Sequence, residues 1–239
     1  VSDRSMEMAY IHLNGFSIIR PQWILLLLLI GFSSLLYAIP DQSKPDIARL
    51  IKQSELETDI HKKIQQYIEI SWQCRYIDPR TGLSYGKKAL MLENQSGFIK
   101  YKPKTLNLIG LNYLQLKKYN QAQNYYFKAV KMATEIDDAQ QLAYAFQNIN
   151  YLYQLLGKYL KAYDITYEAV ALFRKRNHQR GLAYSLHNLG KLEFRFKKYR
   201  EALKNFNEAY RIREIMDDSA GLVESLYQIA AVHFRTGQY

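Results

Sequence analysis

The feature that most constrains this chain is a sequence period of 40 residues, most visible at Tyr119, Tyr159, Tyr199 and Tyr239. The same shift superimposes two alanine series and three polar pairs, namely Ala122, Ala162 and Ala202, then Ala129, Ala169 and Ala209, and Asp137-Asp138, Asn177-His178 and Asp217-Asp218. A fixed period of this length is typical of repeat arrays, in which each unit buries its apolar face against its neighbours. The sequence therefore predicts a solenoid.

Each unit contains two stretches with apolar residues at helical spacing. The first breaks fall at Lys117-Lys118, Gly157-Lys158 and Lys197-Lys198, and the polar pairs form the second breaks. We expect the polar pairs to cap the helices that follow them, because their side chains accept hydrogen bonds from free backbone N–H groups. All five prolines precede Lys104, so no proline interrupts the later helices. The predicted fold class is all-α, with two antiparallel helices per unit.

Small and aromatic residues alternate within the unit in a recognisable order: Gly110, Tyr113, Tyr119, Ala122, Tyr126 and Ala129. This pattern resembles the tetratricopeptide repeat signature over roughly residues 60–239, although the period is 40 instead of 34 and the closing proline is absent after Lys104. The resemblance implies an α-solenoid with the superhelical form of that family. The long variant is similar to repeats of peptide-binding scaffolds and of sensor regions in bacterial signalling proteins such as histidine kinases and nucleotide cyclases.

The period predicts the organisation of the chain. We divide it into a leader or fragment edge (1–22), a hydrophobic signal or anchor helix (23–38), a linker with a lead-in helix (39–59), a degenerate repeat (60–97), three full repeats (98–138, 139–178, 179–218) and a truncated repeat (219–239). The last helix is expected to leave apolar side chains uncovered, among Leu226, Ile229, Ala230 and Phe234, because a unit cannot bury its own apolar face. We therefore expect the natural protein to continue beyond Tyr239.

Residues 23–38 carry no charge and follow Arg20. Sixteen residues lie between the length of a signal-peptide core and that of a membrane span, so a cleaved export signal and an uncleaved anchor both stay open. A buried core helix is disfavoured because the segment has no polar stripe. Both remaining interpretations export the repeats, since Arg20 stays on the cytoplasmic side. The expected location is the cell envelope, on its extracytoplasmic or periplasmic side, exported or anchored in the membrane.

The family resemblance implies that the first helix of each unit lines a concave face where ligands bind. The candidate residues on this face are Asn107, Tyr144, Gln147, Asn148, Tyr151, Tyr184, His187, Asn188, Lys191 and Arg195. Amide side chains both donate and accept hydrogen bonds, and tyrosine adds apolar area with a polar tip, so the set suits an extended peptide. Asn148 and Asn188 are the strongest candidates, unless they only satisfy neighbouring helices. Lys191 and Arg195 fit an acidic side chain or a carboxylate, or form a solvated basic surface.

Several kinds of chemistry find no support in the sequence. A single cysteine, Cys74, excludes a disulfide framework and a zinc site built on cysteines, and the five histidines are scattered. Residues 82–87 resemble a phosphate-binding loop but have three residues between the glycines where four are needed. No catalytic residue, cofactor or metal site is therefore expected. The net charge of +11 is spread over turns and outer helix faces, so nucleic acid is not an expected partner.

These observations predict a protein- or peptide-binding module, the extracytoplasmic sensory or interaction region of a longer bacterial signalling protein. The alternative is a stand-alone envelope scaffold that assembles protein complexes. A cytoplasmic nucleic-acid binder would require residues 23–38 to be neither a signal nor an anchor.

Overall fold

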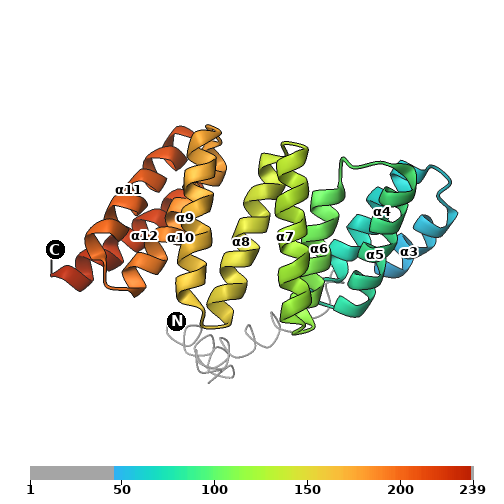
Figure 1. Cartoon of the computed structure of the whole chain (residues 1–239), viewed down its shortest axis with the longest axis horizontal. Helices are drawn as coiled ribbons and strands as arrows, with labels where there is room; N and C mark the ends of the chain where they lie inside the picture. The colour runs from blue at the N-terminus through green and yellow to red at the C-terminus, as the bar shows by residue number, and fades with distance from the viewer. Residues whose placement is uncertain (1–45, 238–239) are drawn as a thin grey trace, which may run out of the picture. The chain divides into compact units, whose positions relative to one another are not determined.

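The structure is a computed structural model that describes residues 46–237, all of whose regular elements are α-helices. The helices are α3 (Ile47–Leu56), α4 (Ile60–Cys74), α5 (Pro79–Ser96), α6 (Lys102–Gln115), α7 (Tyr119–Glu135), α8 (Ala139–Leu155), α9 (Tyr159–Lys175), α10 (Gln179–Arg195), α11 (Tyr199–Ile215) and α12 (Ser219–Thr236) (Figure 1). The predicted signal or anchor segment, residues 23–38, lies outside the described residues. Between residues 46 and 237, no helix combines the length and apolar character that a membrane crossing requires.

The 40-residue period reappears in the helix boundaries. The helices α7, α9 and α11 begin at Tyr119, Tyr159 and Tyr199, and each has 17 residues. The helices between them, α8, α10 and α12, also begin 40 residues apart, at Ala139, Gln179 and Ser219. The predicted pair of helices per unit is thus confirmed, and the described chain forms the hairpins α4/α5, α6/α7, α8/α9 and α10/α11, followed by α12.

The first helices of successive hairpins lie closer together than the second helices do. Each of α4, α6, α8 and α10 has Cα atoms within 8 Å of the next first helix, whereas among the described residues no Cα atoms of α5, α7, α9 and α11 come that close to one another. Long side chains still reach between second helices, as in the ion pair of Arg174 on α9 with Glu208 on α11. A row of hairpins whose first helices are closer together must curve toward them. The first helices therefore form the inner, concave side of the array, as the resemblance implied.

The helix ends follow one scheme along the array. Residues 117, 137, 157, 177, 197 and 217, just after the helix ends, have φ between 52° and 69°. At the end of α6, the N–H of Lys118 donates to the carbonyl of Tyr113 at 2.9 Å, which is the Schellman closure that a left-handed residue permits. The predicted capping by the polar pairs is confirmed: Asp138, His178 and Asp218 accept hydrogen bonds from the N–H groups of residues 141, 181 and 221 at 3.0–3.1 Å.

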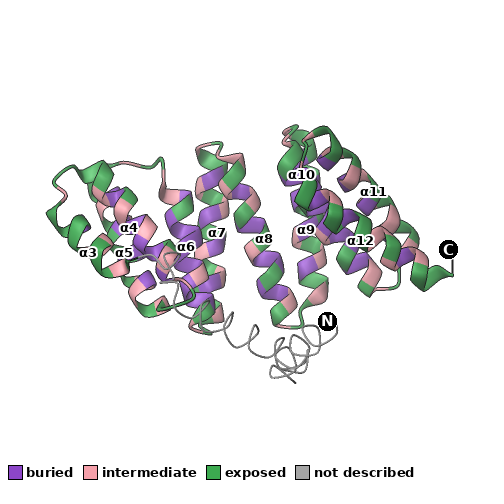
Figure 2. Ribbon diagram, turned by 180° about the vertical axis from the view of Figure 1, so that it is seen from behind, coloured by how far each residue is buried: buried purple, intermediate pink, exposed green. Residues whose placement is uncertain are grey.

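The core lies between the helices, where buried residues face neighbouring elements (Figure 2). A Cβ atom added to Gly110 would lie 2.6 Å from the Tyr126 ring, so only glycine allows α6 and α7 to approach this closely. The same relation joins Gly190 to Phe206, at 2.7 Å. In the hairpin α8/α9, however, the equivalent residues differ.

The two ends of the described array differ from its middle. Residues 82–87, which resemble a phosphate-binding loop, lie inside helix α5, where a Cβ atom on Gly86 would lie 2.9 Å from Ile109 of α6. These glycines therefore serve helix packing.

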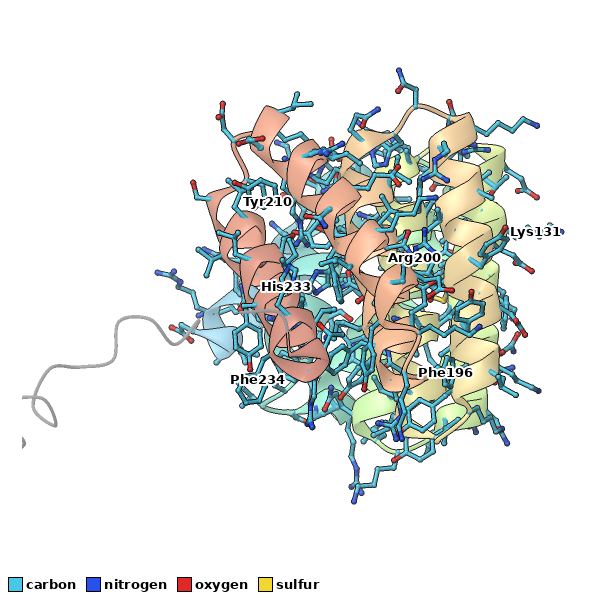
Figure 3. All side chains as sticks on the ribbon, turned by 90° about the vertical axis from the view of Figure 1, so that its left-hand side faces the viewer. Lys131, Phe196, Arg200, Tyr210, His233 and Phe234 are labelled. Carbon is cyan, nitrogen blue, oxygen red and sulfur yellow. The ribbon has the colours of Figure 1, made fainter. Side chains whose placement is uncertain are left out.

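At the other end of the described array, α12 carries Phe234 beside His233, on the opposite side of the hairpins from Lys131 (Figure 3). Leu226 and Phe234 are 51% and 68% exposed, as the predicted uncovered face requires.

Candidate functional site

Two adjoining hollows open on the concave side. The first hollow, about 650 Å³, lies between α4, α6 and α8. The second hollow, about 870 Å³, lies between α8, α9, α10 and the turn before α12. Both are lined by Gln140, Tyr144 and Gln147 of α8, so they form one continuous groove across successive first helices. We call this surface the groove.

The first hollow combines aromatic and amide side chains. Trp72 and Tyr76 lie at the end of α4 and just after it, and Tyr151 lies on α8; all three are between 40% and 64% exposed. The guanidinium of Arg75 stacks on Trp72 at 3.4 Å and on Tyr76 at 4.6 Å from the ring centroids, which holds these two rings in place. Asn148, from the predicted set, lines the same hollow. Flat aromatic surfaces next to amides suit a polypeptide, which presents both side chains and backbone amides.

Asn107 supplies a buried acceptor to the first hollow. Its Nδ2 donates to the backbone carbonyl of Gln141 at 3.0 Å, and because that carbonyl can only accept, the orientation of the amide is fixed. Its Oδ1 is buried and accepts no hydrogen bond from any residue between 46 and 237. Such an atom costs about 1–3 kcal/mol of stability. Asn107 therefore links α6 to α8 and retains an unused acceptor beside the first hollow.

The second hollow extends from the concave surface into the hairpin α8/α9. Its lining includes Asn150 of α8, and Thr166 and Ala169 of α9. All three side chains are almost fully buried. The hollow thus has a floor between two helices, whereas the packing of Gly110 on Tyr126 and of Gly190 on Phe206 closes the neighbouring hairpins. Tyr184 and Asn188 of α10, both predicted site residues, line the same hollow.

Charged residues of both signs line the groove. Lys104 and Glu69 line the first hollow, and Arg180, Asp217 and Asp218 line the second. His178 also lines the second hollow, and its burial lowers its pKa, so that it stays neutral near pH 7. The carboxylates therefore balance or outnumber the cations, and the groove has no excess of positive charge to attract an acidic ligand.

His187 is the clearest departure from the predicted site, because it is only 2% exposed. Its Nε2 lies 3.1 Å from a carboxylate oxygen of Glu224, and its Nδ1 lies 3.4 Å from Arg213, itself buried and bonded to the Gly221 carbonyl and the Ser225 hydroxyl. Burial lowers the pKa of His187 to about 4, although the Glu224 carboxylate opposes this shift. The structure thus places His187 in the packing of α10 against α11 and α12, and the prediction of a ligand-facing histidine is wrong.

Lys191 and Arg195 also lie outside both hollows. The guanidinium of Arg195 lies 3.7 Å from the centre of the Tyr159 ring, so it packs on α9, the second helix of the preceding hairpin. Lys191 is exposed on α10. The pair that was predicted to receive a carboxylate is therefore not brought to the groove.

The other seven predicted residues do line the groove, namely Asn107, Tyr144, Gln147, Asn148, Tyr151, Tyr184 and Asn188. The groove is also lined by residues that were not predicted, among them Trp72, Gln140, Asn150 and Thr166. A signal for two of them was present: the 40-residue shift places Asn150 where other units have Gly110 and Gly190, and Thr166 where they have Tyr126 and Phe206. A unit that loses both a small residue and its aromatic partner is a candidate for a site.

Comparison with known proteins agrees with this architecture. Two tetratricopeptide repeat family models match residues 103–135 and 141–215. The chain carries tetratricopeptide repeats. The matched ranges cover α6/α7 and most of α8 through α11, so both hollows lie largely within the matched repeats. No curated protein matches the sequence.

Solved structures of several other proteins are similar to this fold. BtubC (BKLC) from P. vanneervenii has 17% identity and a TM-score of 0.65, covering 80% of each chain. A Rap protein in complex with competence and sporulation factor has 16% identity and a TM-score of 0.64, covering 78% of this chain and 57% of that one. A signal transduction ATPase with a tetratricopeptide repeat sensor, from Pyrococcus horikoshii, has 19% identity and a TM-score of 0.61, covering 80% and 31%. This chain thus spans only part of the last two proteins, and these identities show a shared fold alone.

Proposed function

We propose that this chain binds an extended peptide segment of a partner protein along the groove, as the extracytoplasmic sensory or interaction region of a longer bacterial signalling protein. Tetratricopeptide repeats form protein-interaction modules. The observation that carries the proposal is the continuous line of amide and tyrosine side chains across α6, α8 and α10, with the buried acceptor of Asn107 at one end. We propose that these residues act by binding and carry out no catalytic step.

The geometry of the groove sets the length of the ligand. Asn148 and Asn188 occupy equivalent positions on adjacent first helices, and packed helix axes lie about 8–10 Å apart. An extended peptide advances about 3.3 Å per residue, so each step from one first helix to the next spans about three peptide residues. The groove from α6 to α10 makes two such steps. A segment of about six residues therefore fits, its backbone bonded to the two asparagines and its side chains against the tyrosines.

Two of the similar structures support a role in signalling. One is a Rap protein in complex with competence and sporulation factor, and the other is an ATPase that carries a tetratricopeptide repeat sensor. In both, the similar region is one part of a longer protein. By analogy, we propose that the repeats described here receive a signal by binding a peptide or protein, and that a separate region responds.

Selection of peptides on the full chain tests the binding proposal. Peptides from a random display library are expected to bind. Asn148→Ala and Asn188→Ala are each expected to lower the affinity for the best peptide about tenfold, since a lost hydrogen bond to the peptide backbone costs about 1–1.5 kcal/mol. Asn124→Ala is the matched control, because Asn124 is exposed on the second helix α7 and lines neither hollow. Equal effects of all three changes, or no selected peptide, would contradict the proposal.

The proposed location rests on the sequence of residues 20–38, where an uncharged stretch follows Arg20. A reporter that is active only outside the cytoplasm, fused after residue 45, is expected to be active in a bacterial host. Replacing two leucines of the stretch by lysine should abolish this activity. An inactive reporter on the unchanged segment would contradict the proposed location but would not affect the proposal of peptide binding.

A further inference from the structure

The second hollow depends on an exchange of side-chain sizes at two equivalent positions. In the hairpins α6/α7 and α10/α11, a glycine of the first helix contacts a ring of the second, as Gly190 does with Phe206. In α8/α9 the corresponding residues are Asn150 and Thr166. Of these three hairpins, only α8/α9 therefore lacks an aromatic ring at the position of Tyr126 and Phe206.

The missing ring leaves an apolar wall inside the hairpin. Phe146 of α8 and Ala169 of α9 line the second hollow together with Thr166, and each is less than 10% exposed. In the neighbouring hairpins, Tyr126 and Phe206 are fully buried at the position of Thr166. The hollow thus offers, from the concave side, apolar surroundings similar to those in which this fold buries an aromatic ring elsewhere.

The floor of the hollow also carries hydrogen-bonding atoms in a fixed arrangement. The Oδ1 of Asn150 accepts from Gln154 at 3.0 Å, and the Thr166 hydroxyl donates to the Ala162 carbonyl at 2.7 Å. These bonds leave the Nδ2 group of Asn150 as a donor, with no acceptor among residues 46–237, and the lone pairs of the Thr166 oxygen as acceptors. A donor and an acceptor therefore lie beside an apolar wall.

A phenol matches this combination. Its ring fits beside Phe146 and Ala169, its oxygen accepts from Asn150, and its hydroxyl donates to Thr166. A carboxylate or phosphate does not match, because the lining contains Asp217 and Asp218 against one arginine, Arg180.

We propose that the second hollow is a specificity pocket for a tyrosine side chain of the bound peptide, which takes the place of the ring that the hairpin α8/α9 lacks. This inference rests on the proposed function, because it assigns a side chain to the peptide in the groove. It adds that a tyrosine is required at one position of the ligand and that phosphorylation of this tyrosine weakens binding.

The test introduces the glycine and phenylalanine pair of the closed hairpin α10/α11 into the open hairpin α8/α9. The double variant Asn150→Gly/Thr166→Phe gives α8/α9 the pair found at Gly190 and Phe206 and is expected to fold with an unchanged or higher melting temperature. The probe is p-cresol, the side-chain analogue of tyrosine, added to the full chain and followed by calorimetry. We expect saturable binding to the unchanged chain, with toluene at least tenfold weaker, and at least a tenfold loss for p-cresol in the double variant.

A second variant keeps the test decisive if the double variant does not fold. Thr166→Val preserves the shape of the floor and removes the hydroxyl, so it is expected to reduce the preference for p-cresol over toluene while toluene binding stays the same. Equal binding of the two probes to the unchanged chain, or full p-cresol binding by the double variant, would overturn the pocket. The display experiment separates the two proposals: selected peptides without tyrosine refute the pocket alone, whereas p-cresol binding without any selected peptide supports the pocket and refutes peptide binding.

Discussion

The hairpins α8/α9 and α10/α11 have the same helix lengths and the same kind of turn, yet one is open toward the concave side and the other is closed. The difference lies in two residues, since Gly190 and Phe206 pack against each other whereas Asn150 and Thr166 line a hollow. The backbone of a repeat is therefore set by the positions that all units share. A change at two facing positions is enough to replace a core contact by a hollow.

A second difference between the units concerns charge. Where α8 has the exposed Gln147, α10 has the buried His187, and where α9 has the buried Phe173, α11 has the buried Arg213. The guanidinium of Arg213 bonds to Ser225 of α12, so the junction of α10, α11 and α12 is held by polar contacts. The apolar junction one unit earlier is held by Phe173, whose ring lies close to Gly181.

The largest expected effect separates the closed hairpin from the open one. Phe206→Ala should lower the free energy of unfolding by about 3–5 kcal/mol, because it leaves a cavity around a fully buried ring. Thr166→Ala, at the equivalent position, should cost only about 1 kcal/mol, because it removes one hydrogen bond and little volume. Urea unfolding of the full chain measures both. Similar losses in the two variants would mean that the hairpins do not differ as described.

The next prediction concerns pH. The pKa of His187 is lowered to about 4, below the ordinary value of 6.5 in the unfolded chain. The unfolded state therefore takes up the proton first, and this residue's contribution to stability is lost as the pH falls from about 6.5 to 4. His187→Gln, which copies Gln147, should reduce the stability lost between pH 7.5 and pH 4.5 by about 2 kcal/mol, as measured by urea unfolding at both values.

The control for this prediction is Gln147→His, which places a histidine at the exposed equivalent position on α8. It should leave the pH dependence unchanged. If the two variants shift the pH dependence equally, the burial of His187 is not its cause.

A smaller effect is expected where glycine allows two helices to approach. Gly190→Ala places a Cβ atom 2.7 Å from the Phe206 ring, so it should destabilise the protein by about 1–2 kcal/mol even though alanine favours helices. Asn150→Ala meets no ring and should change stability by less than about 1 kcal/mol. Thermal unfolding of the two variants compares them directly. A stabilising Gly190→Ala would show that this contact is looser than described.

The smallest expected effect lies in the turns of the same two hairpins. Gly157 and Lys197 occupy equivalent positions with φ of 69° and 61°, a region that costs a residue with a Cβ atom about 1 kcal/mol. Lys197→Gly should therefore stabilise the chain by about 0.5–1 kcal/mol, and Gly157→Lys should destabilise it by a similar amount. Chemical unfolding midpoints measure this reciprocal pair. Changes of the same sign would indicate that the two turns are not equivalent.

The sequence predicted the regular part of the fold well because that part depends on contacts that recur in every unit. The starts of three second helices at Tyr119, Tyr159 and Tyr199, and the capping by Asp138 and Asp218, follow directly from the period. The groove was predicted through Tyr144, Gln147 and Asn148, which the resemblance places on the concave side. The division into eight ranges and the extracytoplasmic location stay predictions.

The rest of the site depends on residues that break the period, so a position in the repeat could not predict it. The burial of His187 depends on Arg213 and Glu224, which lie in two other helices and are 26 and 37 residues away. The aromatic wall of the first hollow comes from Trp72 and Tyr76, in the degenerate unit where the register is weakest. Sequence periodicity shows which side of a helix faces inward, but not which partner from another helix will cover it.

The most direct test of the groove as a binding surface is nuclear magnetic resonance of the side-chain amides, with the full chain titrated by a tyrosine-containing peptide from the display selection. We predict that the signals of Asn107, Asn148 and Asn188 shift progressively to saturation, while those of Asn124 on α7 and Asn207 on α11 stay unchanged. Saturable shifts confined to the second helices, with the three groove asparagines unmoved, would contradict it.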